Sequence, residues 1–319
     1  SAMAGRLLQL LCSRLTRREL SFSAPSSATI LSRLSFSALS SLPTLLSPSS
    51  QNPLHGAYRQ ASWSGEYKFD FVPPPGTNPL KISENTYLPK LFEFRQVTDP
   101  KEEALSELLY KYGVEEPLAK ALGVSGDEHF PYLQYFIEHA CALKELPLVH
   151  LAIEKKTGRP AAFFCSDLVY RDPKDDPLNM TRTAFSENCA HKSKLMEETR
   201  DMAFALYPDE KAVLNKKFGY VAEPFRGIHL TEAMIMYNTD FNEYMKRGVN
   251  IITGHCLHSS MTRACLNVGF NIVGLGIPPK RKDGTLAKKE FGPTVLITID
   301  MRTRRNSDPL PAWRKAGLV

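Results

Sequence analysis

The 319-residue sequence contains no Cys-x-x-Cys pair, no apolar run of 18 residues and no Gly-x-Gly-x-x-Gly fingerprint. The missing apolar run predicts no transmembrane segment. A dinucleotide-binding Rossmann module is disfavoured, because it needs the glycine fingerprint and an acidic residue about twenty positions further on. The cysteines indicate neither a disulfide framework nor a zinc ribbon, because they are irregularly scattered over positions 12, 141, 165, 189, 256 and 265.

Acidic residues are nearly absent from the first 63 residues, which contain six arginines, no lysine and only Glu19 as an acid. Serine and leucine dominate this part of the chain, and the leucines from Leu7 to Leu15 recur at helical spacing. Such a composition is typical of a mitochondrial or plastid transit peptide. We expect residues 1–52 to direct the chain to the mitochondrion, in the matrix or on the matrix side of the inner membrane. A serine-rich tail without targeting function is the alternative.

The rest of the chain is nearly neutral, with a net charge of +1, so composition predicts no nucleic-acid partner. The densest group of metal-ligating residue types is His255, Cys256 and His258. Only the two histidines share a face of a strand and a fourth ligand is missing, so we expect no metal site.

Proline, glycine and asparagine dominate residues 53–90, which predicts an extended arm lying against its own domain or a neighbouring subunit. Residues 302–319 read as a basic tail. Between them, residues 91–301 show the mixed periodicities of an α/β (α+β) domain. The patterns predict strands over 91–97, 147–154, 160–170, 218–221, 249–256, 269–277 and 294–301, and helices over 99–113, from 117, and over 127–143, 184–215, 230–245 and 259–268.

One stretch, FGYVAEPFRGIHLTEAM at 218–234, predicts a strand that leads through EPFRG into a helix. The first turn of a helix leaves backbone N–H groups unpaired and carries about half a positive charge. A strand that delivers the chain directly into such a turn therefore makes an anion site, and pyrophosphate fits it.

The order of the predicted elements resembles that of the GNAT superfamily of acetyl-CoA-dependent N-acetyltransferases. VAEPFRG at 221–227 is similar to the segment that leads into the cofactor helix of the family, and NVGF at 267–270 to the end of its penultimate helix. The hairpin with KKTGRPAAF also matches. EEPLAKALG at 115–123 is similar to the Asp-Glu-Pro-Leu segment of the arylalkylamine N-acetyltransferase-like branch. The resemblance implies a mixed, mostly antiparallel central sheet flanked by helices, with an N-terminal extension.

The resemblance also implies acetyl-CoA as the cofactor, with its pyrophosphate on the loop before the helix. The family has small residues at two loop positions where this chain has His229 and Thr231. A side chain at the first position obstructs the backbone surface or opposes a glycine-type φ, although both side chains can donate to phosphate. For Arg226 an ordinary surface position is the alternative. The implied cofactor residues are Val221, Arg226, Gly227, Ile228, His229, Leu230 and Thr231.

Acetyl transfer to an amine requires a base, donors for the thioester oxygen and an acid for the departing thiolate. The resemblance implies Glu116 as the base, with a pKa that burial must raise; an acid at a helix start is the alternative. Ser259, Ser260 and Thr262 match the hydroxyl segment that the branch uses near thiolate and substrate, although Ser259 can simply cap a helix. Cys265 stands where many relatives have a tyrosine acid, and a buried apolar role is its alternative.

Two functions follow from these residues. The first is a mitochondrial acetyl-CoA-dependent N-acetyltransferase acting on a small amine. The second is a GNAT-fold protein without catalytic activity that serves as an accessory subunit of a mitochondrial complex, which it contacts through residues 53–90. The retained Glu116 and Arg226 favour the enzyme, whereas the altered loop and the long arm favour the subunit.

Overall fold

The computed structural model describes residues 67–78, 85–177, 185–237, 239–276, 278–287, 294–303 and 315, without the side chains of 197–200. The predicted targeting segment, the first part of the arm and nearly all of the basic tail lie outside these residues.

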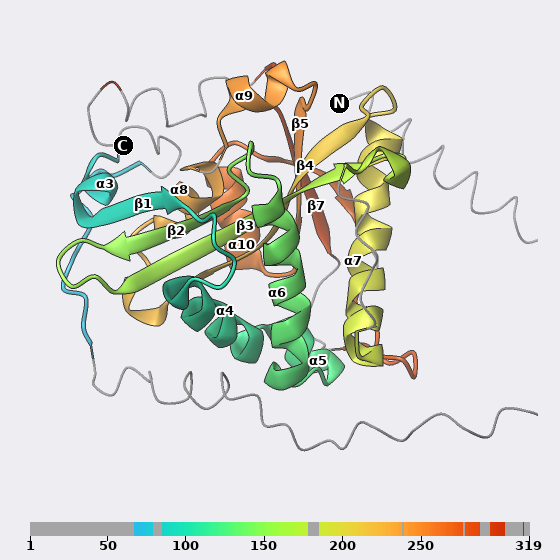
Figure 1. Cartoon of the computed structure of the whole chain (residues 1–319), viewed down its shortest axis with the longest axis horizontal. Coiled ribbons are helices and arrows are strands. Elements are labelled where there is room, and N and C mark those ends of the chain that lie inside the picture. The colour runs from blue at the N-terminus through green and yellow to red at the C-terminus, as the bar shows by residue number, and fades with distance from the viewer. Residues whose placement is uncertain are drawn as a thin grey trace, which may run out of the picture. The chain divides into compact units, whose positions relative to one another are not determined.

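Seven strands form one mixed sheet in the order β1-β2-β3-β4-β5-β7-β6 (Figure 1). Neighbouring strands are antiparallel except β4 and β5, which are parallel. The predicted fold class, a mixed and mostly antiparallel sheet flanked by helices, is confirmed. The strands are β1 (Phe92–Gln96), β2 (Val149–Glu154), β3 (Pro160–Tyr170), β4 (Ala212–Val221), β5 (Ile251–Cys256), β6 (Asn271–Leu275) and β7 (Val295–Asp300).

Helices cover both faces of this sheet. Figure 1 shows α4 and α6 in front of β2 and β3, with α8 and α10 behind. The helices are α3 (Tyr87–Leu91), α4 (Glu103–Glu115), α5 (Pro117–Leu122), α6 (Gly126–Ala142), α7 (Glu187–Leu206), α8 (Leu230–Tyr237), α9 (Phe241–Lys246) and α10 (Ser259–Asn267). None of the helices in the described part of the chain is long and apolar enough to cross a membrane.

Several boundaries differ from the predictions. The predicted helix over 184–215 ends at Leu206, and the following strand begins at Ala212, six residues earlier than predicted. The predicted helix over 230–245 is two helices, because the side chain of Asp240 accepts N–H bonds from Asn242 and Glu243 and starts a new helix. The first helix of the domain continues past Gly113 to Glu115 and begins at Glu103 rather than beside Pro100.

The two central strands part at one end. Strands β4 and β5 pair over only three residue pairs, from Leu214 with Ile252 to Lys216 with Gly254. Beyond Lys216 the register of β4 against β3 shifts, and β4 continues to Val221 without pairing to β5. Gly219 lies in this unpaired part, where a Cβ atom would collide with the ring of Phe164. The sheet therefore opens between the carboxyl ends of β4 and β5.

The described part of the arm packs on its own domain. The ring centroids of Phe69 and Phe225 lie 5.0 Å apart, those of Phe71 and Tyr87 5.2 Å apart, and the Tyr67 hydroxyl donates to Glu154 at 2.6 Å. The short helix α3 takes up residues 87–90, predicted as part of the extended arm, and Leu91, predicted as the start of a strand. Its Pro89 lies in the first turn, where proline is tolerated.

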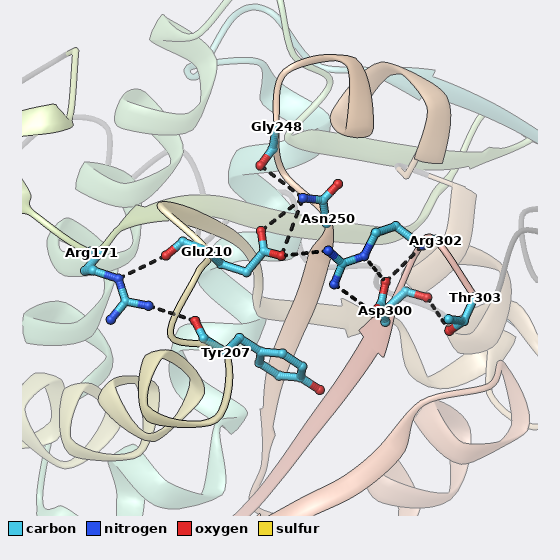
Figure 2. Close-up of polar contacts among 8 residues, drawn as sticks. All are labelled: Arg171, Tyr207, Glu210, Gly248, Asn250, Asp300, Arg302 and Thr303. Carbon is cyan, nitrogen blue, oxygen red and sulfur yellow. Dashed lines mark hydrogen bonds and ion pairs between the residues drawn. The ribbon is translucent and has the colours of Figure 1, made fainter.

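A polar cluster joins the amino ends of β4 and β5 (Figure 2). The buried carboxylate of Glu210 accepts from Asn250 Nδ2 at 3.1 Å and lies 3.2 Å from the guanidinium of Arg302. Arg171 donates to the carbonyl oxygens of Glu210 and Tyr207 at 3.0 and 2.7 Å. These bonds hold the strands together at the end opposite to the opening.

We expect Glu210→Ala to lower the free energy of unfolding by about 1 to 3 kcal/mol, because it leaves the Asn250 amide and Arg302 without their buried acceptor. Chemical denaturation checks this. The control is Glu243→Ala, which removes an exposed pair with Lys246 and should cost less than about 0.5 kcal/mol. Equal effects of the two changes would contradict a role for the cluster.

Candidate functional site

A cavity of about 570 Å³ lies where β4 leads into α8. The loop before the helix and the first turn of α8 form one wall, and residues of α10 form another. Six of the seven predicted cofactor residues line this cavity, which we call the loop cavity; only Ile228 is turned away and buried in the core. The lining loop and strand residues are Val221, Arg226, Gly227, His229, Leu230 and Thr231.

The loop has the backbone conformation that glycine favours, although one position is not glycine. Gly227 has a φ of 84°, and His229 has a φ of 63°. His229 is the only non-glycine residue with positive φ in the described part of the chain. The left-handed conformation costs an L-residue roughly 1 to 2 kcal/mol, so other contacts must hold it there. The imidazole does not fill the cavity: its Nδ1 lies 3.4 Å from a carboxylate oxygen of Glu232.

The charge of the loop cavity is mixed. Arg226 is half-exposed, donates to the Val221 carbonyl oxygen at 3.0 Å and pairs with Glu115 at 3.1 Å. Glu232 is buried in the first turn of α8, and its carboxylate also accepts from Asn267 Nδ2 at 3.2 Å. The unpaired amides of a first helical turn attract an anion, and the carboxylate of Glu232 opposes that attraction.

A larger cavity of about 910 Å³ lies between α6, α7 and the carboxyl half of β4. It shares five lining residues with the loop cavity, so the two cavities meet at the opening between β4 and β5. Tyr132, Tyr135, Phe136 and Phe185 provide an aromatic wall. The shared residues are Tyr112, Glu116, Pro117, Gly219 and Met261.

The far part of the larger cavity holds an imidazole between two carboxylates. His139 Nδ1 lies 3.7 Å from Asp167, and its Nε2 lies 3.5 Å from Asp176. Lys217 pairs with Asp167 at 2.9 Å, and its ammonium lies 3.3 Å from the ring centroid of Phe136. This end of the cavity thus presents both charges against an aromatic surface.

Glu116 belongs to a buried polar cluster at the junction of the cavities. Its carboxylate accepts the N–H groups of Leu118 and Ala119 at 3.1 and 2.7 Å, which makes it the N-cap of α5. Lys192 on α7 lies 2.9 Å from this carboxylate and 2.8 Å from Nε2 of His129. The alternative role, an acid at a helix start, is therefore observed.

The protonation of this cluster differs from the prediction for a base. Burial by itself raises the pKa of Glu116, but Lys192, the backbone donors and His129 together lower it below the ordinary value. Burial and Lys192 lower the pKa of His129 to about 4, so the imidazole is neutral at pH 7. The expectation that burial gives Glu116 a raised pKa is wrong, because the sequence did not reveal Lys192 as its partner.

The hydroxyl segment only partly reaches the site. Ser260 lines the loop cavity, whereas Ser259 and Thr262 line neither cavity. The hydroxyl of Thr262 donates to the His258 carbonyl oxygen at 3.0 Å, and His258 rather than Ser259 is the N-cap of α10. Cys265 is buried, its sulfur 3.9 Å from that of Cys256, and this contact and burial raise its pKa. It therefore has the apolar role named as its alternative.

Sequence reasoning missed Lys192, His129 and Glu232. Lys192 lies on a helix whose mixed charges predict a solvent-facing surface, yet it is buried. Glu232, by contrast, stands three residues after His229 in the first helical turn, so its contact with the imidazole was available from spacing alone. Within the described residues no group of histidines, cysteines and acids could hold a metal ion.

Comparison with known proteins gives structural matches alone. No protein-family model matches the chain, and no curated protein matches it in sequence. Arylalkylamine N-acetyltransferase 7 from Aedes aegypti matches with a TM-score of 0.52 and 11% identity, over 66% of this chain and 87% of the other. Mosquito arylalkylamine N-acetyltransferase like 5b matches with a TM-score of 0.50 and 15% identity, over 66% of this chain and 99% of the other. The C-terminal condensation domain of Ebony matches with a TM-score of 0.52 and 10% identity, over 66% of this chain and 98% of the other.

At such identities the likeness concerns the fold. The mixed, mostly antiparallel sheet flanked by helices matches the fold of these N-acetyltransferase structures. The predicted family resemblance is therefore confirmed at the level of structure.

We expect Lys192→Met to lower the free energy of unfolding at pH 7 by about 3 to 5 kcal/mol, since it leaves the Glu116 carboxylate buried without its cation. In the wild type the lowered pKa of Glu116 stabilises the fold above the ordinary carboxyl range, and this contribution is lost as pH falls. In the variant burial raises that pKa, so protonation relieves the penalty at low pH.

In denaturant titrations, the loss of unfolding free energy caused by Lys192→Met should therefore be largest near pH 7 and shrink toward pH 4. Lys194→Met, an exposed lysine on the same helix that also lines the larger cavity, is the matched control and should show no such dependence. A pH-independent deficit would show that Lys192 acts through packing rather than through its charge.

Proposed function

We propose that this protein is an acetyl-CoA-dependent N-acetyltransferase that acetylates a small amine. One observation carries the proposal: two cavities, one lined by the first turn of α8 and one by aromatic and charged side chains, meet where β4 and β5 part. Such a junction lets a cofactor and an acceptor approach each other from opposite sides of the sheet. The fold likeness to N-acetyltransferases supports this assignment.

The loop cavity is the part that would hold the cofactor, whose acetyl thioester supplies the transferable group. The N–H groups at the start of α8 and the cation of Arg226 suit its phosphates. A cavity of about 570 Å³ remains beside the loop although the imidazole of His229 lines it. These residues suit the pyrophosphate, whereas the carboxylates of Glu115 and Glu232, which also line this cavity, oppose it.

The larger cavity is the part that would bind the acceptor. Its carboxylates and aromatic rings suit an ammonium group on an organic amine. Glu116 stays ionised, so it can bind the ammonium, while its lowered pKa makes it a weak proton acceptor. His139, flanked by Asp167 and Asp176, is a further candidate for the proton acceptor in this cavity.

The alternative is a protein of this fold that does not catalyse and serves as an accessory subunit. The buried carboxylate of Glu232 opposes phosphate binding, but it does not indicate an accessory role. The arm was the proposed contact with a mitochondrial complex. Residues 67–78 of the arm do not support an accessory role, because their aromatic rings pack on the arm's own domain. Cofactor binding separates the two candidates.

We expect calorimetry to detect acetyl-CoA binding to the wild-type chain, and Arg226→Glu to weaken it about tenfold or more through charge repulsion. Glu232→Gln should tighten binding by roughly 3- to 10-fold, because it removes a buried negative charge from the phosphate site. Arg247→Glu, at a surface pair with Glu145, is the control and should change nothing. No heat at millimolar acetyl-CoA for the wild type and for Glu232→Gln would eliminate the enzyme.

We also propose a mitochondrial location, supported by the arginine-rich and acid-poor composition of residues 1–52. A fusion of residues 1–52 to a fluorescent protein should accumulate in mitochondria. Replacing Arg6, Arg14, Arg17 and Arg18 by glutamate should abolish this accumulation, because import favours a cationic amphipathic helix. A diffuse or plastid signal from the unaltered fusion would contradict the proposal.

A further inference from the structure

We infer that Tyr87, in the segment that precedes the sheet, is a positioning residue that completes the cofactor loop by fixing the peptide group between Ile228 and His229. The effect of Tyr87 on cofactor binding rests on the proposed function. Its effect on the conformation of the loop does not. It also gives the N-terminal arm a role within its own domain.

The loop needs support at this peptide. His229 holds a left-handed backbone conformation with a φ of 63°, which glycine adopts freely and which histidine adopts only at a cost. Its imidazole contact with Glu232, at 3.4 Å, is at the long end of hydrogen-bond distances. An interaction that fixes the backbone of this peptide would add to that contact.

The Tyr87 hydroxyl supplies that interaction by donating to the carbonyl oxygen of Ile228 at 3.2 Å. In a trans peptide the C=O and the following N–H point in opposite directions, and the described chain contains no cis peptide. Holding the Ile228 carbonyl on the Tyr87 side therefore turns the N–H of His229 away from Tyr87. His229 lines the loop cavity, and we expect this amide to face an anion bound there.

Tyr87 is itself held by the arm. Its ring packs on Phe71, with centroids 5.2 Å apart. Phe69 and Tyr67 pack on Phe225, the residue directly before Arg226, at 5.0 and 5.9 Å. Burial and the nearby Glu232 raise the pKa of Tyr87 to about 12, so the hydroxyl keeps its proton at neutral pH. The arm thus contacts both sides of the turn that leads into α8.

The test is Tyr87→Phe, which removes the hydroxyl and keeps the ring. The matched control is Tyr237→Phe, which removes a similar hydroxyl bond, to the Phe94 carbonyl oxygen at 2.9 Å, at the other end of α8. Tyr87→Phe should raise the Kd for acetyl-CoA about 3- to 10-fold and leave kcat at saturating cofactor unchanged. Tyr237→Phe should change the Kd less than about twofold.

A His229→Gly background sharpens the test, because glycine keeps the positive φ without help. There the effect of Tyr87→Phe on the Kd should fall below about twofold. An equal effect in both backgrounds, or a lower kcat with an unchanged Kd, would overturn the inference, because either would show that Tyr87 does not act through the His229 backbone.

Amide hydrogen exchange of the ligand-free protein separates this inference from the proposed function. Tyr87→Phe should speed exchange of residues 226–231 several-fold, and Tyr237→Phe should leave it as in the wild type. Unchanged exchange in Tyr87→Phe overturns the inference whether or not acetyl-CoA binds. Faster exchange together with no acetyl-CoA binding to the wild type supports the positioning role and contradicts only the proposed function.

Discussion

The site depends on the short parallel pairing of β4 and β5. At their amino ends the strands are held together by Glu210 and Asn250, and beyond Lys216 they part. Backbone groups left without a neighbouring strand must find other partners or face solvent, so the parting creates a hollow lined by main chain. Gly219 lines both cavities at this point, and its missing side chain leaves room for the ring of Phe164 on β3. Both cavities end at this opening, and without it they would not meet.

The chemistry on either side of the opening is unusual in its balance of charge. On the loop side, a helix start that attracts anions carries the buried acid Glu232. On the other side, Glu116 is buried but ionised, because Lys192 compensates its charge. The loop retains an open backbone despite His229, and contacts from Tyr87 and Glu232 offset the cost of that conformation. Of the residues that provide these contacts, Lys192 is far from Glu116 in sequence and Tyr87 lies before the predicted domain, whereas Glu232 adjoins the loop.

The sequence separation between contacting residues explains how far the sequence could predict the structure. Two apolar runs joined by a Gly-containing turn predicted the hairpin of β2 and β3, and the 3.6-residue period predicted α6, since both signals are local in sequence. The helix over 230–245 was wrong because the side chain of Asp240 competes with helical hydrogen bonds, which an apolar stripe does not show. The loop residues were found because they are contiguous. Lys192 was not found, because only tertiary packing brings its ammonium within 2.9 Å of the carboxylate of Glu116, which stands 76 positions earlier in the chain.

A crystal structure of the protein grown with coenzyme A tests the central claim most directly. The account predicts the pyrophosphate against the first turn of α8, within hydrogen-bond distance of the amides around His229, and the thiol at the opening beside Gly219. Coenzyme A bound elsewhere, or a loop cavity that excludes it while Glu232 stays in place, would contradict the account.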